Sequence, residues 1–148
     1  MGKSILVLLL LVFGLVSVKS QENKSIKSNH LNLAKGVALQ GYDPVSYFTD
    51  TKPREGDKKY SVTHNGAIYY FFTEKNQAAF KKNPSQYIPA YGGWCAYAMG
   101  AKGEKVEIDP ETYKINNGRL YLFYNRFLNN TLPLWNKDEV SLKVKADK

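Results

Sequence analysis

The sequence predicts an α+β fold: a small single domain in which short antiparallel β-hairpins are packed by several short helices. Two hairpin signals and one capped helical segment lead to this prediction. The chain has 148 residues, the length of one domain, and 43% of them are hydrophobic, which is enough to form a buried core. This composition disfavours wholesale disorder and fibrous repeats.

The first hairpin is predicted where residues 59–64 and 67–72, two β-prone runs, are joined by Asn65-Gly66. Asn-Gly is the strongest short hairpin signal, because both residues tolerate a positive φ. Residues 113–115 and 119–123 flank a second turn of this kind at 116–118. Each pair of runs is therefore expected to form a two-stranded antiparallel unit.

Helices are expected between and after the hairpins. Thr73 can cap a helix over residues 74–82, and the Asn-Pro pair at 83–84 ends it. The Gly-Gly pair at 92–93 predicts a tight turn into a short helix that ends at Gly100 or Gly103. From residue 125 onward, apolar residues interrupted by Pro133 predict two short helices packed over the sheet.

Residues 1–20 are typical of a signal peptide. Lys3 precedes an uncharged stretch over residues 5–18, which is short for a membrane span, and a small residue, Ser20, precedes the expected cleavage point. An uncleaved N-terminal anchor is the alternative. Residues 21–33 are polar and predict a flexible leader, and residues 34–148 the domain. The mature chain is thus expected to be secreted or periplasmic, without stable membrane insertion.

The charge balance is basic, with 21 Lys and Arg against 13 Asp and Glu and a net charge of +8. The lysines are scattered and form neither a dense stripe nor an arginine cluster. A nucleic-acid partner is therefore not expected, and weak attraction to acidic cell-surface polymer is the most that the charge indicates. The sequence leaves the oligomeric state open.

Three segments, residues 41–48, 60–100 and 109–125, resemble the YHS-domain family, in particular its secreted branch of a signal peptide and one domain. The resemblance extends from about residue 37 to residue 135. Members with cysteines in two motifs are thought to bind heavy metals. At the corresponding positions this chain has Ser46, Phe72 and Asn76, which are poor ligands or no ligands for soft metals. The resemblance therefore implies the fold but not that metal site.

The lone cysteine, Cys95, is the main candidate for chemistry. One cysteine excludes an internal disulfide and a Cys-only metal site. Cys95 is expected near a helix N-terminus with Met99 four residues further on, so a thiolate and a thioether could bind copper as Cu(I), with His64 as a third ligand. The alternatives are a small buried hydrophobic residue, a reactive thiol and an intermolecular disulfide.

An enzyme using Cys95 would need His64 within hydrogen-bond reach and a third group, such as Asp43, Asn65 or Asp109, to orient the imidazole. Nothing in their spacing requires this arrangement. The sequence also contains no phosphate-binding glycine loop, no His-Glu-x-x-His and no Gly-x-Ser-x-Gly. Catalysis is therefore less favoured than binding.

The aromatic residues suggest a ligand pocket with a mixed apolar and hydroxyl-bearing wall. The alternative is that these side chains alternate along strands and fill the core. If a pocket forms, we expect two glycine-containing loops to bring together Tyr42, Asp43, Tyr47, Tyr91, Trp94 and Cys95.

These observations favour a secreted or periplasmic binding module for a small ligand or a soft metal, with copper the expected metal, near Cys95. A thiol-dependent enzyme or redox protein using Cys95 is one alternative. A structural or interaction module with no small ligand is the other.

Overall fold

The computed structural model describes residues 28–148. The predicted signal peptide and residues 21–27 of the predicted leader lie outside the described residues. Within the described part, the helices and strands form a small α+β domain, as predicted. None of its helices has both the length and the apolar character needed to cross a membrane.

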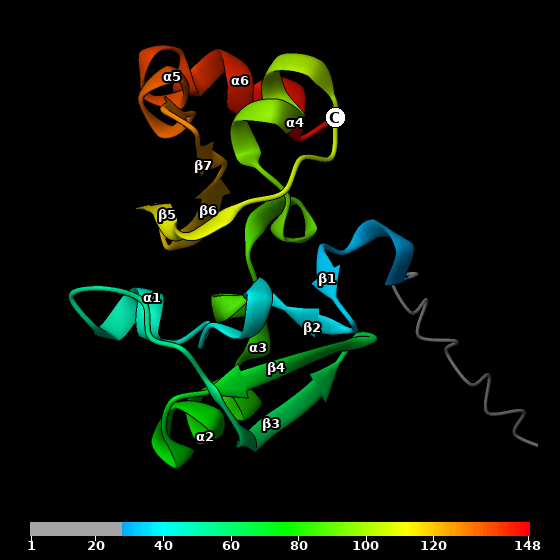
Figure 1. The fold of residues 1–148 in the computed structure, drawn as a ribbon, viewed down its shortest axis with the longest axis vertical. Helices are drawn as coiled ribbons and strands as arrows, with labels where there is room; N and C mark the ends of the chain where they lie inside the picture. The colour runs from blue at the N-terminus through cyan, green and yellow to red at the C-terminus, as the bar shows by residue number, and fades with distance from the viewer. Residues whose placement is uncertain (1–27) are drawn as a thin grey trace, which may run out of the picture.

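The first half of the domain carries a four-stranded sheet with the order β1-β2-β4-β3 (Figure 1). The strands are β1 (Leu33–Ala34), β2 (Val37–Ala38), β3 (Asp57–His64) and β4 (Ala67–Phe71). β2 runs parallel to β4, and the other two pairs are antiparallel. Short 3₁₀ turns, η1 (Ser28–His30) and η2 (Leu39–Gly41), flank the first two strands.

Three helices accompany this sheet: α1 (Ser46–Thr49), α2 (Glu74–Lys82) and α3 (Pro84–Tyr87). The predicted hairpin over β3 and β4 is confirmed, and so is the α2 helix. The backbone N–H of Asn76 donates to the Thr73 hydroxyl at 3.1 Å, which is the expected cap. Pro84 does more than end α2, because it occupies the first turn of α3, where its missing N–H costs nothing.

The second half contains a second hairpin and the C-terminal helices, in the upper part of Figure 1. Its elements are η3 (Ala90–Gly93), α4 (Ala96–Lys102), β5 (Asp109–Asn116), β6 (Arg119–Phe123), β7 (Asn125–Arg126), β8 (Asn129–Asn130), α5 (Leu132–Lys137) and α6 (Glu139–Ala146). β5 and β6 pair antiparallel around the predicted turn. Gly103, in the left-handed conformation, ends α4.

Three details differ from the sequence-based expectation. The ordered chain begins before residue 34, because Asn32 is buried and its side chain donates to the Gly93 carbonyl at 3.1 Å. Pro133 does not interrupt the C-terminal segment but lies in the first turn of α5. Residues 125–130, expected to lead into a helix, form the small β7–β8 hairpin instead.

Apolar side chains fill two cores: the first draws residues from both halves, and the second lies within the second half. Phe71 and Phe80 are fully buried in the first core, and Tyr121, Phe123 and Trp135 are fully buried in the second. In the second half α4 lies directly against α6. A Cβ on Gly100 would meet the Leu142 carbonyl oxygen at 2.5 Å, so only glycine permits this approach.

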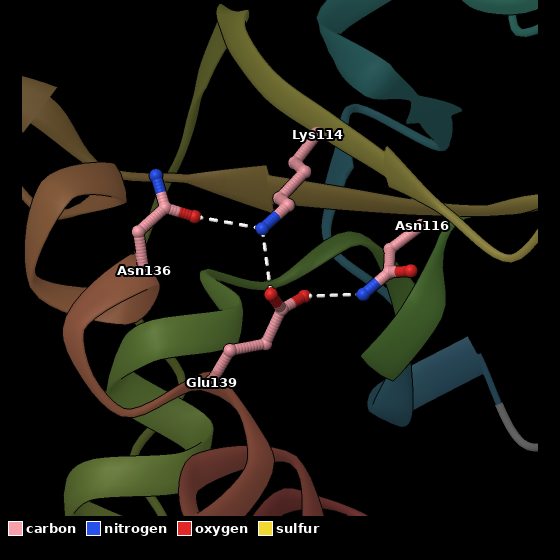
Figure 2. A network of polar contacts seen from close by, with 4 residues as sticks. All are labelled: Lys114, Asn116, Asn136 and Glu139. Atoms are coloured by element: carbon pink, nitrogen blue, oxygen red, sulfur yellow. Dashed lines mark hydrogen bonds and ion pairs between the residues drawn. The ribbon is translucent and has the colours of Figure 1, made fainter.

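A polar network fastens the C-terminal helices to β5 (Figure 2). Lys114 Nζ lies 2.6 Å from a Glu139 carboxylate oxygen and 2.8 Å from the Asn136 side-chain oxygen. The Asn116 amide donates to the other Glu139 oxygen at 2.6 Å. Partial burial would raise the pKa of Glu139, but the hydrogen bonds from Lys114 and Asn116 outweigh it and hold that pKa below its ordinary value.

Candidate functional site

The six residues predicted to share a pocket lie in three separate places. Tyr42, Asp43 and Tyr47 belong to the segment around α1, beside the four-stranded sheet. Tyr91 and Trp94 line one cavity, and Cys95 lines another. The two loops that carry these residues therefore do not form one joint pocket.

Asp43 is completely buried, and hydrogen bonds satisfy its carboxylate. One oxygen accepts from the backbone N–H of Val45 at 2.8 Å and from that of Ser46 at 3.3 Å. The other accepts from the backbone N–H of Phe72 at 2.8 Å and from the Asn76 amide at 2.7 Å. Asp43 thereby connects the start of α1 with the end of β4 and the first turn of α2.

The three positions where the YHS-domain family would have cysteines all contact this carboxylate. Ser46 contributes its backbone N–H, and its hydroxyl donates to the Asp43 carbonyl at 2.7 Å. Phe72 contributes only its backbone, because its ring is exposed and has the Arg54 guanidinium 4.2 Å from its centroid. Asn76 contributes its side chain. Hydrogen bonds thus hold this centre together without a metal ligand set.

Tyr47 and Tyr42 lie beside the Asp43 centre. The Tyr47 hydroxyl donates to the Pro110 carbonyl at 2.7 Å, and its ring packs edge-on against Tyr113. Burial, assisted by nearby acidic groups, raises the pKa of Tyr47 well above its ordinary value. Burial also raises the pKa of Tyr42, with Glu111 the strongest charged contributor. The Tyr47 hydroxyl, with its bond to Pro110, is therefore a neutral structural group.

Tyr91 and Trp94 line a cavity of about 370 Å³, together with Met99 and Lys105. The Trp94 indole N–H donates to the His30 carbonyl at 3.0 Å. The Tyr91 hydroxyl lies 3.2 Å from an Asp147 carboxylate oxygen. Burial first, and then the Asp147 carboxylate, raise the pKa of Tyr91. Here too the polar atoms are used in contacts within the chain.

Cys95 immediately precedes α4 and is completely buried, and it is one of the residues that line a cavity of about 360 Å³. The backbone N–H of Tyr124 donates to the sulfur at 3.4 Å. The Thr131 hydroxyl lies 3.5 Å from the sulfur and donates to the Tyr124 carbonyl at 2.9 Å. Because that hydroxyl has a single hydrogen, the Cys95 S–H is left to point at the Thr131 oxygen.

The cavity beside Cys95 has mostly apolar walls and a polar rim. Its walls come from α4, the loop between α4 and β5, the residue after β6, and α5; they consist of Tyr97, Ala98, Val106, Tyr124 and Leu134. The other residues that line it are Cys95, Lys102, Glu104, Asn129 and Thr131. This composition is typical of a pocket for a small, mainly apolar molecule with one polar group.

The predicted soft-metal ligands are not brought together around this cavity. Met99 lines the cavity of Tyr91 and Trp94. His64 ends β3 and packs edge-on against Phe80, with ring centroids 5.9 Å apart, and β3 and α4 lie in opposite halves of the molecule (Figure 1). Over residues 28–148, no three His, Cys, Asp or Glu side chains gather where they could hold a metal ion.

Sequence reasoning identified Cys95 but missed the residues that surround it. Thr131, Tyr124 and Leu134 lie between 29 and 39 residues after Cys95, and no local pattern links them. The β7–β8 hairpin, which brings Thr131 back to Tyr124, has no Asn-Gly signal. Comparisons with protein-family models, with curated proteins and with solved structures find no match to this chain.

Proposed function

We propose that this chain is a secreted or periplasmic binding module with a YHS-like domain, and that it holds a small ligand in the cavity beside Cys95. The observation that carries the proposal is that cavity, at about 360 Å³ and with mainly apolar walls. Ligand pockets have volumes of about 300–1,000 Å³, a few polar groups and otherwise apolar walls. The extracytoplasmic location rests on the sequence of residues 1–20.

The lining indicates what kind of ligand fits. Tyr97, Val106 and Leu134 suit an apolar body, and Thr131 and Cys95 lie at the buried end, where their hydrogen bonds are already formed. Lys102 is exposed at the rim and forms none of the ion pairs found in residues 28–148. A small molecule with an apolar body and one acidic or hydroxyl group would match both the apolar walls and the exposed Lys102 at the rim.

The YHS-like assignment is supported by the surroundings of Asp43. Ser46, Phe72 and Asn76 are spread over 30 positions of the sequence, yet all three contact one carboxylate. The fold therefore brings these three positions to one centre, although the Phe72 side chain itself is exposed. This chain has the arrangement without the thiols, which fits a member of the fold that has lost that metal site.

Two other functions have less support. A copper site at Cys95 would need a second soft ligand, and the two partners of the sulfur are a hydroxyl and a backbone N–H. A thiol enzyme would need a base, and neither partner is one. Both remain alternatives, and they predict that Cys95→Ser abolishes stoichiometric Cu(I) binding or thiol reactivity, respectively.

The thiol provides a reporter that tests the proposal. We expect methyl methanethiosulfonate, a small reagent, to modify Cys95 in the folded protein through the cavity, and octanoate or octan-1-ol to slow that reaction in a saturable manner. Leu134→Trp should block the cavity and remove protection by both ligands. Val140→Trp, on the exposed surface of α6, is the matched control and should leave protection unchanged.

Two results would contradict the proposal. One is modification of Cys95 only at the rate of global unfolding, established from its urea dependence. The other is protection that survives Leu134→Trp. Native mass spectrometry of the same samples with Cu(I) tests the metal alternative separately.

A further inference from the structure

Four two-residue turns connect antiparallel strands within residues 28–148. Their flanking pairs are Ala34 with Val37, His64 with Ala67, Asn116 with Arg119, and Arg126 with Asn129. All eight turn residues have a positive φ, the conformation in which glycine and asparagine are least strained. Three of the turns have glycine in the second place: Lys35-Gly36, Asn65-Gly66 and Asn117-Gly118.

The fourth turn, between β7 and β8, consists of Phe127 and Leu128. Their φ angles are 52° and 64°, which is unfavourable for bulky side chains. Packing does not compensate, because Phe127 is 94% exposed and Leu128 is fully exposed. Within residues 28–148, neither local conformation nor the core explains these two residues, and an exposed apolar pair of this kind is typical of a contact surface.

We propose that the β7–β8 turn is a membrane-binding tip that inserts Phe127 and Leu128 into the surface of an anionic lipid bilayer. Arg126 adjoins the tip, is exposed and takes part in none of the three ion pairs formed within residues 28–148. A cation beside an apolar tip complements anionic headgroups. The net charge of +8 acts in the same direction.

The area of the tip favours lipid over a protein partner. A stable protein interface buries about 800 Å² on each side, from twenty or more residues. The apolar tip offers two residues, and the next exposed large apolar residue along the chain is Leu134 on α5. A bilayer needs no complementary surface, so two protruding side chains suffice for weak, reversible binding. This inference does not depend on a ligand in the Cys95 cavity.

The sharpest test replaces the tip with the turn that this chain uses elsewhere, in the variant Phe127→Asn/Leu128→Gly. Asn-Gly relieves the backbone strain, so the thermal midpoint should rise. Binding to vesicles of equal phosphatidylcholine and phosphatidylglycerol, measured by flotation of the full chain, should fall at least about tenfold, because two apolar side chains no longer leave water. The thermal midpoint should rise while vesicle binding falls, so unfolding of the variant cannot explain the weaker binding.

Controls separate the tip from the rest of the chain. Val140→Ser removes an exposed apolar residue on α6 and should leave vesicle binding unchanged. Arg126→Gln should weaken binding to the anionic vesicles several-fold, with little effect on pure phosphatidylcholine or in high salt. All variants retain residues 1–20, so any contribution of that segment is common to them.

Three outcomes would overturn the proposal. The first is that the full chain does not float with anionic vesicles. The second is equal flotation of the wild type and Phe127→Asn/Leu128→Gly. The third is concentration-dependent association of the wild type, seen by sedimentation without lipid and lost in the double variant, which would assign the tip to contact between copies of the chain.

Discussion

Asp43 and Cys95 are two buried polar residues in comparable places with opposite surroundings. Each is completely buried, and each lies just before a short helix, α1 or α4. The Asp43 carboxylate accepts four hydrogen bonds from three segments of chain. The Cys95 sulfur has two long contacts, and the residue lines a cavity.

This difference in hydrogen bonding and free space indicates where the domain has room for a ligand. A carboxylate with four donors already has all the partners it needs, so Asp43 fixes the arrangement of the strands and helices around it. The apolar cavity that Cys95 helps to line has room for another molecule. A buried polar residue therefore indicates a site only when its partners and its surroundings are considered together. Substitutions at Asp43, at Cys95 and at further polar residues test whether Asp43 is structural and Cys95 is the wall of a site.

The largest effect is expected at Asp43. Asp43→Ala leaves the buried N–H groups of Val45 and Phe72 and the Asn76 amide without an acceptor, at about 1–3 kcal/mol each. We expect the free energy of unfolding, measured in urea, to fall by at least about 3 kcal/mol. Asp43→Asn, which retains one acceptor, should lose less. A loss below about 1 kcal/mol for Asp43→Ala would contradict the assignment of Asp43 as a structural centre.

Tyr69 tests a buried polar group that lacks the partners of Asp43. Burial alone raises its pKa to about 12. A raised pKa favours the neutral form in the folded state, so its contribution is complete below pH about 10 and is lost as the pH rises toward 12. Tyr69→Phe should leave stability at pH 8 nearly unchanged and reduce the loss between pH 10 and 12 by up to about 2 kcal/mol. If the free energy of unfolding fell equally with pH in the wild type and in Tyr69→Phe between pH 10 and 12, the raised pKa of Tyr69 would be contradicted.

Cys95 should contribute far less to stability than Asp43. We expect Cys95→Ala to lower the free energy of unfolding by about 1 kcal/mol, because the sulfur makes only long contacts and already borders free space. Thr131→Val, which removes the donor to the Tyr124 carbonyl, should cost about as much. A loss near that of Asp43→Ala would indicate that Cys95 is a structural centre and not the wall of a site.

The smallest effect is expected for Glu139, which is partly exposed. Glu139→Gln removes the charge paired with Lys114, at a cost of about 0.5–1 kcal/mol. Because the pKa of Glu139 is lowered in the folded state, this contribution is present above the unfolded pKa and is lost as the pH falls through the folded one. The two proteins should therefore become equally stable near pH 3. A difference that persists there would contradict the assignment.

The sequence was informative where structure is encoded locally. Asn65-Gly66 predicted one hairpin and Thr73 predicted the start of α2, because each acts through its own backbone. The turn at Phe127 and Leu128 was missed because it violates the preferences on which such prediction relies. Solvent exposure cannot be read from a local sequence pattern. The sequence therefore did not show whether these two side chains would be exposed or buried.

The candidate site was predictable only in part. Cys95 stood out as the single thiol, but its contact with Thr131 joins residues 36 positions apart and depends on the β7–β8 hairpin. Tyr91 and Trp94 were expected beside it because they are near in sequence. In the structure, the turns around Gly92 and Gly93 direct them to another cavity. Sequence proximity is a poor guide when a left-handed turn intervenes.

The late position of Thr131 and Leu134 has a consequence for biosynthesis. Both walls of the cavity leave the ribosome well after Cys95, so the nascent chain presents an uncovered thiol until the hairpin and α5 emerge. The cavity exists only once these later residues have folded against Cys95. Whatever enters the cavity must be acquired by the finished domain, in the compartment where the domain completes its folding.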